Sequence, residues 1–155
     1  MKTKLTFLLL FSGSSGVYGD DYQDGWDAYE RQDYKTAYKL WLPLAEEGYS
    51  GAQYNLGLMY DNGQGVPQDY KEAVKWYRLS AEQGDAFAQF NLGLMYVEGK
   101  GVPQDYVLAH MWFNICGSTG DKDCVKNRNI VEESMTPQQI EKAQEMARNW
   151  KPTTK

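Results

Sequence analysis

Two cysteines eight residues apart carry the most reactive side chains in this sequence. Cys116 and Cys124 stand on either side of Gly120, and the chain contains no other cysteine. They could form a disulfide, remain as two free thiols, or act as a redox or metal-binding pair. An even number of cysteines in an exported chain favours pairing, and the leader described below indicates export. We therefore expect Cys116 and Cys124 to be joined.

The other candidates for chemistry are weak. His110 is the one histidine, and a single imidazole without clustered ligands is expected to be structural. The paired glycines around Gln64 and Lys100 are interpreted as turns, because no Lys-Ser or Lys-Thr follows them to hold a phosphate. Lys35-Thr36-Ala37 is not the Lys-Thr-Gly motif of penicillin-recognising enzymes, and their Ser-x-x-Lys motif is missing. We predict no catalytic residue, no metal site and no cofactor.

The first 19 residues have the pattern of a secretory signal peptide. Lys2 and Lys4 precede an apolar run over residues 5–11, and small or polar residues then lead to Val17-Tyr18-Gly19. The run is too short for a membrane anchor, which requires roughly 18 apolar residues. No cysteine follows it for lipid attachment. Cleavage is expected after Gly19, which would give a periplasmic or secreted protein.

The composition predicts an acidic, folded domain. Removing the leader takes away two lysines and no acid, so the formal net charge changes from −5 to −7. No basic stripe is present to neutralise phosphates, so we expect no nucleic-acid partner, and anionic membranes would repel this surface. The 42% hydrophobic and 14% aromatic content predicts a packed core.

A repeat of 36 residues determines the fold class. Residues 52–60, AQYNLGLMY, match residues 88–96, AQFNLGLMY, and residues 63–70, GQGVPQDY, match residues 99–106, GKGVPQDY. A period of roughly 20 to 50 residues with helix-like spacing is typical of stacked helical hairpins, each of which buries one face on its neighbour. The same interval separates three glycines that are expected to end helices: Gly48, Gly84 and Gly120.

Each repeat is predicted to contain two helices separated by a loop of Gly and Pro. Ala52, Leu56 and Tyr60 recur at helical spacing on the core side of the first helix. Gly57 and Gly93 lie inside first helices, where Gly costs about 1 kcal/mol relative to Ala. We expect the partner helix to pack against the bare backbone at these two positions.

The whole chain is predicted to be all-α, with about three hairpins and C-terminal capping helices. The expected repeats cover about residues 22–49, 50–85 and 86–121, and the cap covers residues 122–151. Asp69 followed by Glu72 predicts an N-cap for a second helix, and Thr136-Pro137-Gln138-Gln139 predicts a capping box that opens the last helix.

These residues resemble the Sel-1-like repeat family, a branch of the tetratricopeptide superfamily, over roughly residues 22–122. Both full copies meet nearly every position of the family's pattern, which runs Ala, Leu-Gly-x-x-Tyr, Gly-x-Gly-Val-x-x-Asp-Tyr, Ala, Trp and Ala-x-x-Gly. The resemblance implies a right-handed α-solenoid adaptor, often periplasmic and seldom an enzyme. Cysteine-rich secreted members of the family join cysteines at the same spacing of eight residues.

Six side chains are predicted to line a partner-binding groove, on the side of the first helices that faces away from the core: Tyr54, Asn55, Leu58, Phe90, Asn91 and Leu94. In tetratricopeptide-like solenoids this face lines the concave groove. Asn55 and Asn91 are expected to present exposed amides to an extended peptide, and the aromatic residues to supply apolar pockets. Alternatively, all six are consensus residues that serve packing.

The predicted function is therefore that of a scaffold for a protein or peptide partner, without catalytic activity. The alternative is a cell-wall-active protein that binds or hydrolyses peptidoglycan or β-lactams.

Overall fold

The structure, a computed structural model, describes residues 14–153 of the chain, with side chains from residue 19 onward. Within this range the chain forms helices joined by short loops. Their bounds are α1 Ser14–Glu30, α2 Tyr34–Glu46, α3 Ser50–Asn62, α4 Tyr70–Glu82, α5 Ala86–Glu98, α6 Tyr106–Gly117, α7 Lys122–Glu132 and α8 Pro137–Asn149.

Aspartates cap the starts of α2, α4, α5, α6 and α7, and glycines cap the ends of α3 and α5. The Asp69 carboxylate accepts hydrogen bonds from the backbone N–H groups of Lys71 and Glu72 at the start of α4, as predicted. Thr136 forms the predicted capping box at the start of α8. Gly63 ends α3 with a φ of 64°, in the left-handed region that glycine adopts without strain.

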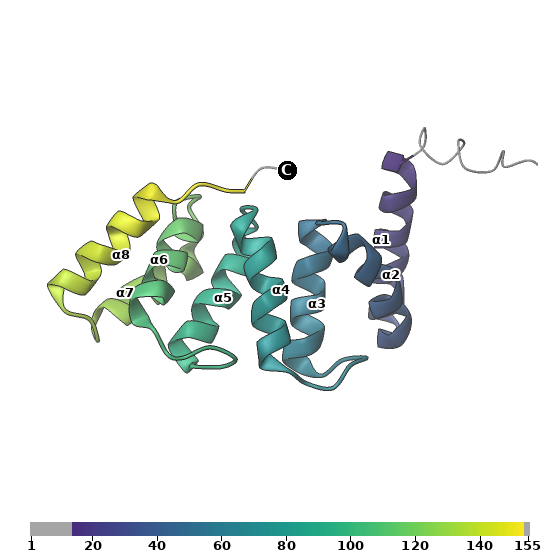
Figure 1. Cartoon of the computed structure of the whole chain (residues 1–155), viewed down its shortest axis with the longest axis horizontal. Coiled ribbons are helices and arrows are strands. Elements are labelled where there is room, and N and C mark those ends of the chain that lie inside the picture. Colours follow the sequence, from purple (N-terminus) through teal and green to yellow (C-terminus); the bar gives the residue numbers. More distant parts are fainter. Residues whose placement is uncertain (1–13, 154–155) are drawn as a thin grey trace, which may run out of the picture.

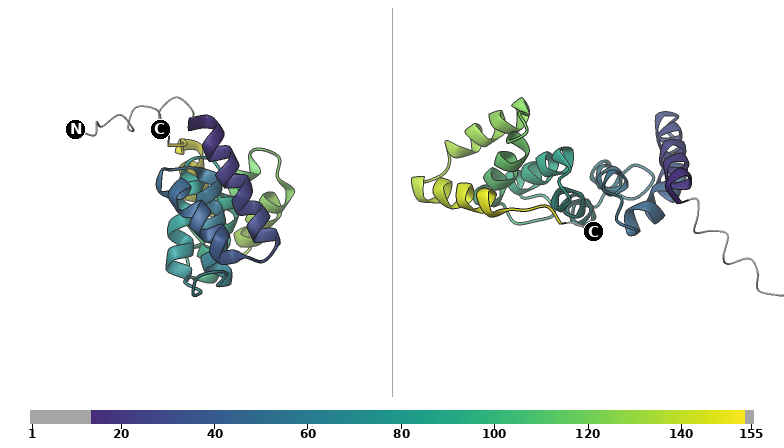
Figure 2. Two further views of the ribbon diagram at one scale, coloured as in Figure 1. Left: turned by 90° about the vertical axis from the view of Figure 1, so that its right-hand side faces the viewer. Right: turned by 90° about the horizontal axis from the view of Figure 1, so that it is seen from above.

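The helices pair as hairpins that stack in the order of the sequence. α1 packs on α2, α3 on α4, and α5 on α6, while α2 contacts α3 and α4 contacts α5. Figure 1 shows the resulting row, with α1 at one end and α7 and α8 at the other, and Figure 2 shows it end on and from above. The predicted all-α fold of three hairpins followed by capping helices is confirmed.

A glycine of the first helix faces an aromatic ring of the second helix in every hairpin. A Cβ atom on Gly57 would collide with the ring of Tyr77, and one on Gly93 would lie 2.6 Å from the ring of Phe113. Gly25 faces Trp41 in the same way. The expectation that a partner helix packs against the bare backbone is confirmed, because all three rings are almost fully buried.

The C-terminal helices close the row on one side. The disulfide between Cys116 and Cys124 joins the end of α6 to α7, as expected, with 5.9 Å between the Cα atoms. α8 packs back on α6. Beyond it, the chain runs as an extended segment toward α4, where the backbone N–H of Thr153 donates to the carbonyl oxygen of Glu82 at 2.7 Å (Figure 1).

The predicted leader lies largely outside the described residues. α1 begins at Ser14 and continues through the expected cleavage point at Gly19. Among the side chains of α1 that the structure describes, from residue 19 onward, Tyr22, Trp26 and Ala28 pack against the rest of the protein. Cleavage after Gly19 would keep all three of them.

We predict that Gly57→Ala destabilises the protein, because the new methyl group meets the Tyr77 ring. This clash should outweigh a gain in helix propensity of about 1 kcal/mol and lower the free energy of unfolding by roughly 1 to 3 kcal/mol, measured by urea denaturation. The control is Asn62→Ala at the exposed end of the same helix. Equal effects of the two substitutions would contradict the prediction.

Replacing both cysteines with serine should lower the free energy of unfolding by about 2 to 3 kcal/mol, the loop-closure value for a bridge of this length. The same loss should appear when the wild-type protein is reduced. Titration with Ellman's reagent should find no free thiol in the native, unreduced protein. Two thiols that react without denaturant would show that the bridge is not formed.

Candidate functional site

Five of the six predicted groove residues are partly accessible, and one is not. Tyr54 and Leu58 on α3 are half-buried, and so are Phe90, Asn91 and Leu94 on α5. Asn55, in contrast, has only 1% of its surface exposed. The expectation that Asn55 presents an exposed amide is therefore wrong.

Asn55 is buried because the preceding hairpin covers it. Its Nδ2 donates to the hydroxyl of Tyr22 on α1 at 3.3 Å. Its Oδ1 has no hydrogen-bond partner within the described residues. Asn55 thus connects α1 to α3. This contact supports the alternative that Asn55 serves packing, and not the hypothesis that it lines a partner-binding groove.

Asn91 occupies the same place one repeat later. Burial and the nearby Asp85 carboxylate raise the pKa of Tyr54, and a hydrogen bond with the Asn91 side chain opposes that rise. Tyr22 and Tyr54 are equivalent, since each lies three residues before the glycine that faces an aromatic ring. Asn91 is therefore placed near the Tyr54 hydroxyl much as Asn55 is placed at the Tyr22 hydroxyl.

Tyr77 of α4 lies beneath the surface formed by the predicted groove residues. Burial raises the pKa of its hydroxyl above the usual range, and the charge of Asp61 adds to the rise. The hydroxyl donates to Asp61 Oδ2 at 3.2 Å. The Tyr77 ring also lies 6.0 Å from that of Tyr54, measured between centroids. The face is consequently held in place from below by α4.

The most exposed aromatic ring in the described residues belongs to Phe87, at the start of α5. Phe87 is 68% exposed and lies 6.0 Å from the Tyr54 ring. Tyr49, just before α3, is 47% exposed and packs edge-on against Tyr22 at 5.0 Å. Together with the half-buried residues, Phe87 and Tyr49 extend the predicted surface along the beginnings of α3 and α5.

Sequence reasoning missed Phe87 and Tyr49, although a signal was present. At a spacing of 36 residues, Phe87 corresponds to Gly51, and Tyr49 corresponds to Asp85. A large apolar residue at a position that takes Gly or Asp in the neighbouring repeat is not required for the shared packing. Such positions are candidates for contact with another molecule.

Other groups with catalytic potential have structural partners. His110 is fully buried, and its Nε2 lies 2.6 Å from Glu132 Oε1 of α7. Both cysteines are in the disulfide. Among the residues that the structure describes, no group of three or more His, Cys, Asp or Glu side chains is placed to hold a metal ion. No helix in residues 14–153 is long and apolar enough to cross a membrane.

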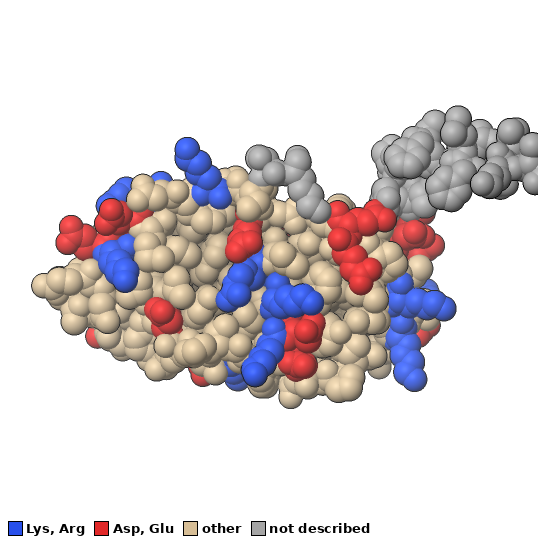
Figure 3. Space-filling model, in the orientation of Figure 1, with Lys and Arg blue, Asp and Glu red and all other residues tan. Residues whose placement is uncertain are grey.

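The charges do not form a large field of one sign on the face seen in Figure 3. Acidic and basic side chains are interspersed there between wide uncharged areas. An ion pair between Lys100 and Glu98 is one example of this mixing, with 2.6 Å between Nζ and Oε2. Exposed apolar and aromatic side chains therefore distinguish the candidate site better than charge does.

The repeated hairpins and the apolar face define an α-helical repeat protein without a catalytic constellation in the described residues. The Sel1 repeat family matches residues 18–49, 50–85 and 86–115, and the chain belongs to this family. Sel1 repeats typically act as protein-interaction modules. No curated protein matches the sequence significantly.

Two solved structures are similar to this one. The first is c5321, described as a protective antigen present in uropathogenic Escherichia coli strains that displays an SLR fold; it is 31% identical over 88% of this chain, with a TM-score of 0.82. The second is a Sel1 repeat protein from Oxalobacter formigenes, 31% identical over 79% of this chain, with a TM-score of 0.69. The chain spans about 30% of the first protein and 52% of the second.

We predict that Asn55→Ala lowers the free energy of unfolding by about 1 to 2 kcal/mol, because it removes a buried hydrogen bond. Asn62→Ala, at an exposed position on the same helix, should change stability by less than about 0.5 kcal/mol. In a Tyr22→Phe background the cost of Asn55→Ala should shrink, since the hydroxyl is already gone. An undiminished cost in that background would mean that the contact with Tyr22 does not stabilise the fold.

Proposed function

We propose that this protein is an exported scaffold that binds a peptide or protein partner on the surface formed by Tyr54, Leu58, Phe87, Phe90, Asn91 and Leu94. The observation that carries the proposal is the exposed ring of Phe87 beside the half-buried ring of Tyr54. An exposed aromatic side chain supported by buried residues is the usual centre of a protein interface.

The surface has the properties that peptide recognition requires. Tyr54, Leu58, Phe90 and Leu94 all pack against the buried core, so their positions are fixed before a partner arrives. Binding then loses little side-chain entropy. Asn91 supplies an amide among these apolar groups, and an amide can bond the backbone of an extended peptide.

Two observations support export. The Cys116–Cys124 disulfide fits an oxidising compartment such as the periplasm or the exterior of the cell. The sequence pattern of residues 1–19 is that of a secretory leader.

Photo-crosslinking at Phe87 tests the binding surface. We expect benzoylphenylalanine at this position to capture one specific protein from the native host, and the yield to fall when Leu58 is changed to Asp. The matched control carries the crosslinker at Ile130, an exposed apolar residue of α7, and should not capture that protein. Equal capture from both positions would contradict the proposed surface.

Intact-mass measurement tests export. After expression in a host with a secretion apparatus, the protein recovered outside the cytoplasm should begin at or near Asp20. A mass that retains residues 1–19 would contradict the predicted cleavage.

A further inference from the structure

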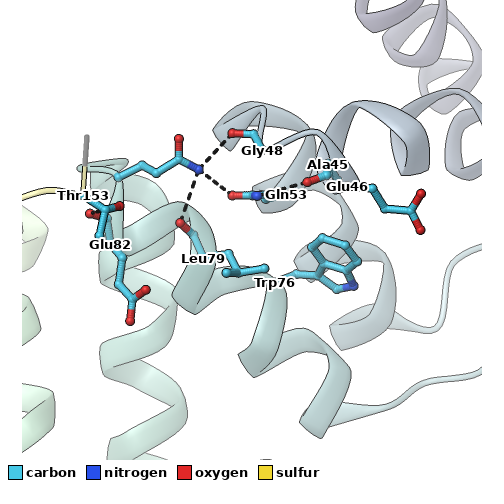
Figure 4. Close-up of a pocket in the computed structure, with 9 residues that line it drawn as sticks. Ala45, Glu46, Gly48, Gln53, Trp76, Leu79, Glu82 and Thr153 are labelled. Atoms are coloured by element: carbon cyan, nitrogen blue, oxygen red, sulfur yellow. Dashed lines mark hydrogen bonds between the residues drawn. The ribbon is translucent and has the colours of Figure 1, made fainter. Parts of the chain in front are cut away.

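A recessed surface lies between α2 and α4, and it shares no residue with the surface around Phe87. It has a volume of about 430 Å³. Trp76 and Leu79 of α4 and Gln53 of α3 line it, with Glu46 and Glu82 at its edges, and Thr153 of the C-terminal segment borders it beside Glu82. Figure 4 shows these side chains around the hollow. We call it the α2–α4 groove.

An amide network holds one wall of the α2–α4 groove in place. Gln83 Nε2 donates to Gln53 Oε1 at 2.8 Å and to the carbonyl oxygen of Gly48 at 3.0 Å, as Figure 4 shows. Gln53, 4% exposed, donates in turn to the carbonyl oxygen of Ala45. The wall is thus formed by fixed side chains and does not depend on mobile surface groups.

One repeat later, the protein fills the equivalent position with its own C-terminal segment. The Trp150 ring packs edge-on against Trp112, with 6.0 Å between ring centroids. Thr153 donates to the carbonyl oxygen of Glu82 with its backbone N–H at 2.7 Å and with its hydroxyl at 3.1 Å. Pro152 passes over Gly84. An extended tetrapeptide therefore lies across α4 and α6.

The residues that hold this tetrapeptide have counterparts in the α2–α4 groove. At the repeat spacing of 36 residues, Trp76 corresponds to Trp112, Glu46 to Glu82, and Gly48 to Gly84. The carbonyl oxygen of Glu46 at the end of α2 accepts no hydrogen bond from the described residues. The α2–α4 groove thus repeats the binding elements that the C-terminal segment uses, with the hydrogen-bond acceptor still available.

The charge of the α2–α4 groove indicates what it would accept. Glu82 lines this groove where the equivalent residue one repeat later is the neutral Ser118. With Glu46 at the opposite edge, the groove presents two carboxylates near an indole ring, and it belongs to a chain of net charge −5. A basic segment fits these edges better than an acidic one. The C-terminal segment itself carries Lys151 between its two anchors.

We propose that the α2–α4 groove binds an extended basic peptide segment of a partner protein. The segment carries an aromatic residue that packs on Trp76 and, three residues later, a donor that bonds the carbonyl oxygen of Glu46, in the manner of Trp150 and Thr153. Trp76 lines the groove with the 7% of its surface that is exposed. Lys75, whose ammonium lies 5.1 Å from the Trp76 ring centre, is not among the lining residues.

The test uses the full mature chain and a blocked synthetic peptide of sequence WKPTTK, which copies the residues after Asn149. In ¹⁵N-labelled protein, saturable shifts are expected for the Trp76 indole and for the side-chain amides of Gln53 and Gln83. Leu79→Lys should weaken binding about tenfold or more, because it puts a like charge in the groove. Ile130→Lys, the same change at another exposed apolar position, should leave binding unchanged.

Three results would overturn the proposal. The first is that no chemical shift changes saturably at millimolar peptide concentration, or that Leu79→Lys and Ile130→Lys weaken peptide binding equally. The second is a shift of the Trp112 indole in place of Trp76, which would mean that the peptide displaces the protein's own C-terminal segment. The third is a dimer that dissociates when residues 150–155 are deleted, which would identify the occupant as the C-terminal segment of a second copy.

Discussion

The close approach of a glycine to an aromatic ring sets the distance between the two helices of each hairpin. Gly57 faces Tyr77 so closely that even one methyl group would have to displace the ring. Because protein interiors are packed as densely as organic crystals, such a displacement is transmitted to neighbouring side chains. Three hairpins use this device in turn, and the spacing of the whole row depends on it.

The binding surface follows from this spacing. Once α3 and α4 are held together by Gly57 and Tyr77, the ring of Tyr54 rests on Tyr77 and supports Phe87 of the next hairpin. Asn55 then connects one hairpin to the next through the Tyr22 hydroxyl, so it belongs to the framework. Phe87, which corresponds to Gly51 one repeat earlier, is expected to give this surface its specificity, while the recurrent residues around it both maintain the packing and supply apolar contacts.

Much of the fold could be predicted from the sequence, because periodic signals report local structure directly. The 36-residue repeat, the Asp69 cap and the glycines inside helices each imply a helix boundary or a close helix contact. The burial of Asn55 could not be predicted, because it depends on how closely α1 approaches α3. The return of Thr153 to Glu82, 71 residues away in the sequence, breaks the repeat pattern and left no periodic signal.

A double-mutant cycle between Gly57→Ala and Tyr77→Leu measures the central packing constraint directly. If the glycine is present to accommodate the ring, alanine at position 57 should be tolerated once the ring is gone. Its cost should fall by roughly 1 kcal/mol or more in the Tyr77→Leu background, with the two changes coupled as expected for residues in contact. Strictly additive effects, with the same cost for Gly57→Ala in both backgrounds, would contradict the account.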